Sequence, residues 1–158
     1  MKQLIYMITC LCLLGNFIFS QVPESKQATL IEAVSSSEWL LEATGIYNSS
    51  ETREKKAKKD VDKNGVTKAI DDAKKSAIYF VLFGGTDPMI STPRERQLFD
   101  QHESFYFDIS NVSRYISWEE SALQKKIKLN SGKGLKVVKR LKVNKTIIMK
   151  DLENHSIL

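Results

Sequence analysis

The chain has 158 residues, of which 42% are hydrophobic and 27% are charged, and its formal net charge at pH 7 is +5. This size fits one domain with a modest core, and the absence of internal repeats excludes a repeat architecture. Mild basicity favours acidic partners such as membrane headgroups or wall polymers, and nucleic acid would be a partner only in the cytosol.

The first twenty residues have the pattern of a secretory signal peptide. Lys2 gives a short basic start, and the stretch from Leu4 to Phe19 is apolar but shorter than the roughly 20 residues of a membrane span. We expect cleavage after Ser20 and therefore export, to the periplasm, the envelope or the medium, with nucleic acid excluded as a partner. An uncleaved anchor and lipidation at Cys10 are the alternatives. Because Cys12 also lies here, the processed chain would have no disulfide.

The next segments are a tether, a strand and a charged insert. Residues 21–37 mix polar and apolar positions around Pro23 and a run of serines, so they predict a polar tether that could include a short helix. Residues 38–47 carry the apolar and aromatic content of a strand. Residues 49–63 are dominated by charge and predict a solvated insert within a single domain that spans residues 38–158.

The segment from residue 60 to residue 71 has the spacing of a calcium-binding loop, with Gly65 at the position of the turn. The candidate ligand side chains are Asp60, Asp62, Asn64 and Asp71. The last position is an aspartate where a bidentate glutamate usually stands, and the surrounding lysines oppose a cation. A linker, a turn and a following helix explain the same residues more simply. We therefore predict no metal site and no cofactor, with the calcium loop as an alternative.

Two helices follow. Apolar residues recur at three- and four-residue steps from Val66 to Val81, and Gly84 with Gly85 ends that helix. A second helix begins at Thr92, which forms a capping box with a glutamate three residues later and is followed by proline at the first helical position. His102 lies on its continuation and is interpreted as an ordinary residue of a helix face.

The C-terminal third predicts a hairpin and a closing helix. Residues 123–129 and 135–143 both alternate with a period of two, and a loop with two glycines separates them. Pairing Leu129 with Leu135 sets the register. Asn144 can then cap a last helix.

This register has two consequences. It places Lys125 opposite Lys139, which is unfavourable for like charges, so one end of the hairpin should splay or bulge. It also lines one face of the sheet with basic side chains, a candidate binding surface for anionic lipid or polymer. That surface consists of Lys126, Lys128, Lys136, Arg140 and Lys142. A solvated face without a ligand explains the same pattern, and lysines on exposed strands also oppose aggregation.

Together these elements predict an α+β domain, with a small antiparallel sheet covered on one face by helices and the order β-α-α-β-β-α. The segments "EATG" (residues 42–45), "DDAKKSA" (71–77) and "VN" (143–144) resemble a family of small exported domains. That family includes the N-terminal domain of flagellar assembly protein T and related envelope lipoproteins. The resemblance covers roughly residues 38–155 and implies a structural or assembly role in the bacterial cell envelope.

No catalytic pattern accompanies this fold. The "FGGTDP" segment lacks the Gly-Lys-Ser/Thr ending of a phosphate-binding loop, and no serine lies in a Gly-x-Ser-x-Gly elbow. Asp71 and Asp72 are adjacent on a helix and point in different directions. We therefore expect a non-catalytic protein that binds other envelope proteins, with binding of anionic lipid or wall polymer, or a calcium-dependent module, as alternatives.

Overall fold

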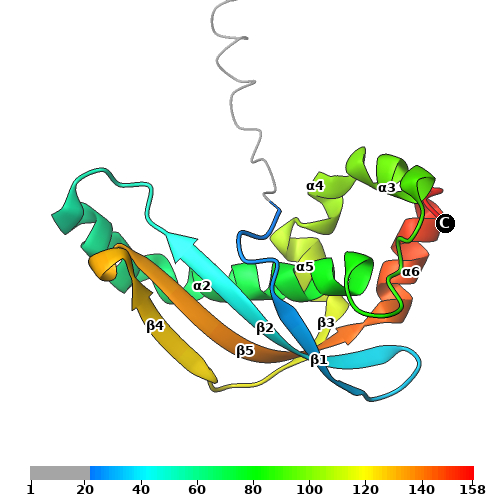
Figure 1. Cartoon of the computed structure of the whole chain (residues 1–158), viewed down its shortest axis with the longest axis horizontal. Coiled ribbons are helices and arrows are strands. Elements are labelled where there is room, and N and C mark those ends of the chain that lie inside the picture. Colours follow the sequence, from blue (N-terminus) through cyan, green and yellow to red (C-terminus); the bar gives the residue numbers. More distant parts are fainter. Residues whose placement is uncertain (1–21) are drawn as a thin grey trace, which may run out of the picture.

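The computed structural model describes residues 22–158, so the predicted signal peptide lies outside the described residues. Labels follow Figure 1. The strands are β1 (Ala28–Ala33), β2 (Glu38–Asn48), β3 (Ile116–Glu119), β4 (Lys125–Leu129) and β5 (Gly134–Asn144). The helices are α2 (Glu54–Phe83), α3 (Pro93–Asp100), α4 (Glu103–Tyr106), α5 (Ile109–Tyr115), α6 (Lys145–Asn154) and the 3-10 turn η1 (Asn130–Gly132).

The five strands form one antiparallel sheet in the order β1-β2-β5-β3, and β4 pairs with the other end of β5. β3 and β4 thus share one edge of β5, like a single strand that is interrupted between them. The helices lie on one face of this sheet, with α2 running along it and the remaining helices gathered at one end (Figure 1). The predicted α+β fold is therefore confirmed.

Small residues let α2 lie close against the sheet. A buried residue recurs at every fourth position of the helix: Ala57, Val61, Gly65, Ala69, Ala73, Ala77 and Val81. Gly45 of β2 lies directly under this row, where an added Cβ would be 1.8 Å from the Ala69 carbonyl oxygen and 2.5 Å from the Ala73 nitrogen. Only glycine can occupy that position without moving the backbone.

The two segments before α2 differ from the prediction. Residues 28–33, predicted as part of a tether, form the edge strand β1, which pairs with β2 through a bulge. The charged insert is not a linker, because its residues from Glu54 onward are the first turns of α2. Ala57 and Val61 supply the narrow apolar stripe that this end of the helix needs, and the lysines between them remain exposed.

The hairpin of β4 and β5 forms, but its register differs from the prediction by one residue. Leu129 is opposite Gly134 rather than Leu135, and Lys125 is opposite Val138 rather than Lys139. The loop is correspondingly shorter, since η1 and Lys133 connect the strands with Asn130 and Ser131 at positive φ. The predicted clash of like charges is therefore wrong, and the faces of β4 are exchanged.

The end of the domain that holds the short helices has an aromatic core. Phe99 contacts Phe83 at 5.0 Å between ring centroids and Tyr106 at 4.9 Å. The predicted capping box of α3 is present, because Thr92 accepts from Glu95 N–H and the Glu95 carboxylate accepts from Thr92 N–H. The predicted cap of the closing helix is also confirmed, since Asn144 accepts from two backbone N–H groups of α6.

Candidate functional site

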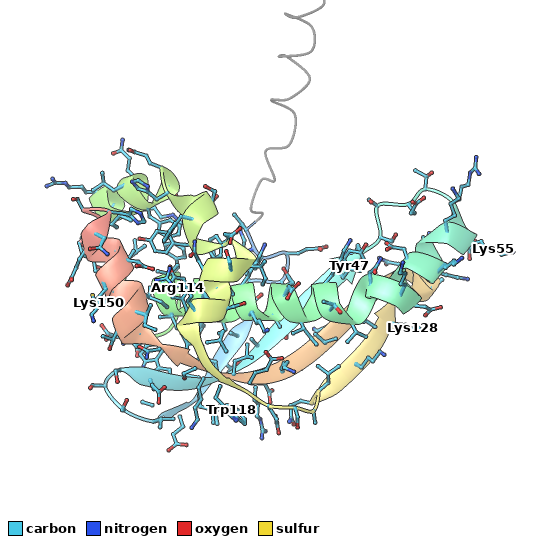
Figure 2. All side chains as sticks on the ribbon, turned by 180° about the vertical axis from the view of Figure 1, so that it is seen from behind. Tyr47, Lys55, Arg114, Trp118, Lys128 and Lys150 are labelled. Carbon is cyan, nitrogen blue, oxygen red and sulfur yellow. The ribbon has the colours of Figure 1, made fainter. Side chains whose placement is uncertain are left out.

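The predicted basic surface does not lie on one face of the sheet. Residues directly opposite in an antiparallel pair point to the same face. Lys126 and Lys128 lie opposite the buried Val137 and Leu135, which places them on the helix side. The Lys128 ammonium accordingly reaches the Asp62 carboxylate of α2 at 3.0 Å. Figure 2 shows Lys128 beside α2, while Trp118 lies below the sheet.

The other three predicted basic residues, Lys136, Arg140 and Lys142, do face away from the helices. This uncovered surface of the sheet is here named the open face. Its other members, from all five strands, are Thr29, Glu32, Glu38, Leu40, Glu42, Thr44, Ile46, Trp118, Lys125, Ile127 and Val138. The open face therefore alternates acidic, basic and apolar side chains rather than presenting a basic field.

Two contacts organise the charge on the open face. The Arg140 guanidinium pairs with the Glu42 carboxylate at 3.4 Å, so that each neutralises the other across β5 and β2. The Lys142 ammonium lies 5.8 Å from the ring centroid of Trp118, within range of a cation–π contact. Trp118 itself is 44% exposed. A large aromatic side chain beside a compensated ion pair is typical of a protein-binding surface.

A hollow borders the open face next to β1. Its volume is about 490 Å³, and its lining comes from β1, the segment before it, β2 and β5. The lining residues are Lys26, Gln27, Ala28, Thr29, Glu42, Thr44 and Val138. Because Glu42 and Lys26 contribute opposite charges, a polar side chain fits this hollow better than an extended anion does.

Lys139 is not one of the residues predicted to form the basic surface, although its neighbours in β5 are. Lys139 points to the same face of β5 as the buried residues, and its side chain is only 4% exposed. The Glu119 carboxylate receives both the Lys139 and the Lys74 ammonium at 2.7 Å. Burial opposes the charge of Glu119, but the two lysines outweigh it and lower its pKa. This triad ties β3, β5 and α2 together and is structural.

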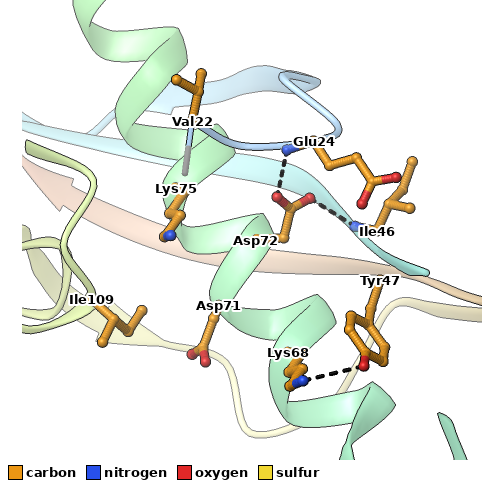
Figure 3. A pocket seen from close by; sticks show the side chains of 9 residues that line it. All are labelled: Val22, Glu24, Ile46, Tyr47, Lys68, Asp71, Asp72, Lys75 and Ile109. Atoms are coloured by element: carbon orange, nitrogen blue, oxygen red, sulfur yellow. Dashed lines mark hydrogen bonds between the residues drawn. The ribbon is translucent and has the colours of Figure 1, made fainter. Parts of the chain in front are cut away.

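A second hollow, of about 400 Å³, lies on the helix side beside α2 (Figure 3). The Asp72 carboxylate at its base accepts from the backbone N–H groups of Glu24, Ser25 and Ile46. The carboxylate thereby satisfies the Ile46 N–H of β2, at a position beyond the residues of β2 that pair with β1. Burial raises the pKa of Asp72 despite these hydrogen bonds. Asp72 is thus occupied in anchoring the segment that leads into β1.

The neighbouring charges of this hollow are also perturbed by the fold. Burial raises the pKa of Asp71 and lowers that of Lys75. Lys68 donates to the Tyr47 hydroxyl at 3.2 Å. Acidic and basic groups therefore balance one another along one side of α2, which is typical of a polar helix surface.

The four candidate calcium ligands do not form a loop. Residues 60–71 lie within the continuous helix α2, whose residues two apart point in different directions. The Asp60 carboxylate instead accepts from Tyr47, Ser49 and Asn64, and Asp62 pairs with Lys128. Within residues 22–158, no group of three acidic, histidine or cysteine side chains is arranged to hold a metal ion. The calcium-loop interpretation is wrong.

The two histidines, which are far apart in the sequence, meet in the structure. The rings of His102 and His155 stack with centroids 4.5 Å apart and an angle of 13°. His155 Nδ1 also shares a hydrogen bond of 2.9 Å with the Tyr106 hydroxyl. His102 precedes α4 as its cap residue rather than lying on a helix face. No short-range signal in the sequence indicates this contact, because 52 intervening positions separate the two.

Comparisons of the chain with protein-family models, with curated proteins and with solved structures gave no match. Among the described residues, none of the helices combines the length and the apolar character that crossing a membrane requires.

Proposed function

We propose that this chain is a non-catalytic exported protein that binds another protein of the cell envelope and acts there as a structural or assembly component. The observation that carries this proposal is the open face. It is uncovered by any described helix and combines the exposed Trp118 with compensated charges. Export is inferred from the signal-peptide pattern of residues 1–20.

The structural roles of three carboxylates support the non-catalytic part of the proposal. Asp72 accepts three backbone N–H groups, and Glu119 bridges two lysines. Asp151 of α6 accepts from the Tyr115 hydroxyl at 2.8 Å. Carboxylates that are engaged in this way hold elements together and are not placed for proton transfer to a substrate.

The alternative ligand, an anionic lipid or wall polymer, is less well supported. Two of the five predicted basic residues, Lys126 and Lys128, point to the helix side, and a third, Arg140, is paired with Glu42. The remaining lysines of the open face are interspersed with Glu32 and other acidic residues, which repel an anionic surface. Binding through aromatic and paired polar side chains fits a folded protein partner better.

Site-specific photocrosslinking in the host cell tests the proposal. A photoreactive amino acid replaces Trp118 on the open face, and in a matched control it replaces Lys150 on the outer side of α6. We expect the probe at position 118 to capture one envelope protein that the control does not capture. Capture of the same protein from both positions, or of no protein from position 118, would contradict the proposal.

A second arm separates the two ligand classes. The double variant Lys136→Glu/Lys142→Glu is compared with the native protein for retention on vesicles of anionic lipid. We expect weak retention of the native protein and no more than a small change in the variant. Strong retention that the variant abolishes, without a change in melting temperature, would favour the anionic ligand instead.

A further inference from the structure

The two edges of the sheet are protected very differently against pairing with another strand. The β4 edge carries three exposed lysines within five residues, Lys125, Lys126 and Lys128, whose charges oppose pairing with another strand. β3 on the same side has only four residues, and its last one is held by Lys139 and Lys74. Natural sheets use charged and short edge strands to prevent association edge to edge.

The β1 edge has no such basic residues. No lysine or arginine stands between Gln27 and Val34, and five of the six residues of β1 are exposed. Leu30, Ile31 and Val34 are 39%, 45% and 40% exposed, so three large apolar side chains lie within five positions. Three exposed apolar side chains in so short a segment differ from the usual case, in which exposed apolar residues are scattered singly over a protein surface.

The pairing of β1 with β2 leaves part of this edge unused. Leu30 is opposite Leu41 and Glu32 is opposite Leu40, so Ile31 has no partner residue in β2. α2 lies over β2 and β5 and only marginally over β1, so the described helices do not cover the edge. On its outer side β1 pairs with no strand of residues 22–158, which leaves backbone N–H and C=O groups available to an added strand.

We propose that β1 pairs with β1 of a second copy of this chain, giving a twofold-symmetric dimer. An antiparallel pair centred between Leu30 and Ile31 puts each of these residues opposite the other in the partner copy. In the same register Glu32, the one charged residue of β1, lies opposite Thr29, whose hydroxyl can donate to the carboxylate. The edge is thus complementary to itself in hydrogen bonding and in apolar character.

This arrangement joins the two sheets into one. A twofold axis perpendicular to the sheet relates antiparallel edge strands, so both open faces lie on the same side. The bulge at Ile31 shortens the regular ladder, and the dimer is therefore weak and depends on concentration. The inference concerns self-association and does not depend on the envelope partner proposed above.

Sedimentation of the protein, purified as its host cell produces it, tests this inference over a wide concentration range. We expect the mass to rise from that of one chain to that of two. Ile31→Lys should weaken dimerisation by at least about tenfold, because it adds a charge at the centre of the contact. Leu30→Lys is a second variant with the same expected effect. Both positions are exposed, so circular dichroism should show an unchanged fold.

Met149→Lys is the matched control, since Met149 is 37% exposed on α6, away from β1. It should dimerise like the native protein. Three results would overturn the inference: one-chain mass at every concentration, assembly beyond two chains, or a dimer that both β1 variants leave intact. Equal loss of the dimer in Met149→Lys would overturn it as well.

Discussion

The two ends of α2 are held in different ways. At the C-terminal end, Phe83 packs into a cluster of aromatic rings that includes Phe99, Tyr106 and Phe107. At the N-terminal end, Ala57 and Val61 offer little apolar surface, and the Asp60 carboxylate makes hydrogen bonds to the end of β2 and the loop after it. One end is therefore stabilised by burial and the other largely by surface polar contacts, and we expect the N-terminal end to open first.

Gly45→Val should have the largest effect on stability, because it pushes the middle of α2, between the two ends, away from the sheet. The new Cβ would overlap the Ala69 carbonyl oxygen, and neither backbone can yield locally. We expect a loss of at least about 5 kcal/mol in the free energy of unfolding, which is comparable to the whole stability of a small domain. Urea unfolding followed by circular dichroism measures it.

Gly65→Ala is the matched control for this substitution. Its added Cβ would meet the Val61 side chain at 3.1 Å and the Leu135 side chain at 3.6 Å, and side chains can shift. Alanine also favours the helix over glycine by up to about 1 kcal/mol. A stability change of the same size in both variants would show that the close approach at Gly45 is not the cause.

Phe99→Ala breaks the aromatic end alone. Phe99 is fully buried and contacts three other rings, so its removal leaves a large cavity. We expect the free energy of unfolding to fall by about 3–5 kcal/mol. Hydrogen exchange should accelerate most in α3 to α6. Faster exchange mainly in the first turns of α2 would contradict the division into two ends.

Acid should loosen the polar end through Asp60. Hydrogen bonds from Ser49, Tyr47 and Asn64 lower the pKa of Asp60 to about 2. A carboxyl whose pKa is lower in the folded state stabilises above its unfolded pKa of about 4, and this stability is lost as the pH falls through about 2. We expect the amide protection of residues 54–64, which is the exchange rate relative to the intrinsic rate at each pH, to fall over that range in the native protein.

Asp60→Asn is the control for this pH dependence. Near neutral pH, the amide protection of the first turns of α2 in this variant should already resemble that of the acidified native protein. The fall in amide protection between pH 4 and pH 2 should then be absent from this segment. An unchanged pH profile in the variant would assign the effect to other carboxylates.

Lys128→Gln should have the smallest effect. Lys128 and Asp62 form an ion pair at 3.0 Å, but their side chains are 62% and 64% exposed. Exposed pairs contribute little, so the free energy of unfolding should change by less than about 0.5 kcal/mol. A larger loss in urea unfolding would mean that the polar end depends on this pair more than its exposure indicates.

Local signals in the sequence predicted the elements that they control directly. The capping box at Thr92 and the cap at Asn144 act within three residues, and both helices begin there. The alternation in β5 likewise predicted which of its residues are buried. The charged first turns of α2 were not predicted as helix. Two buried apolar residues, Ala57 and Val61, are enough to pack these turns, because the sheet lies close to the helix.

Features that depend on turn geometry or on distant residues were not predictable in this way. The register of β4 is set by the turn at residues 130–133, with two residues at positive φ, and a slip of one residue moved Lys126 and Lys128 off the open face. β1 reads as a polar tether because an exposed edge strand lacks a buried side. The contact between His102 and His155 exists only once α6 returns to α4.

The interruption between β3 and β4 also has a practical consequence for protein engineering. Glu120 and Gln124 each donate a backbone hydrogen bond to β5, and both ends of the gap are therefore fixed. Ser121 and Ala122 between them are exposed and belong to no strand. A peptide tag or a fluorescent label inserted between these two residues should leave both ladders of β5 intact. The chain thus offers an internal attachment point at the edge of the sheet opposite β1.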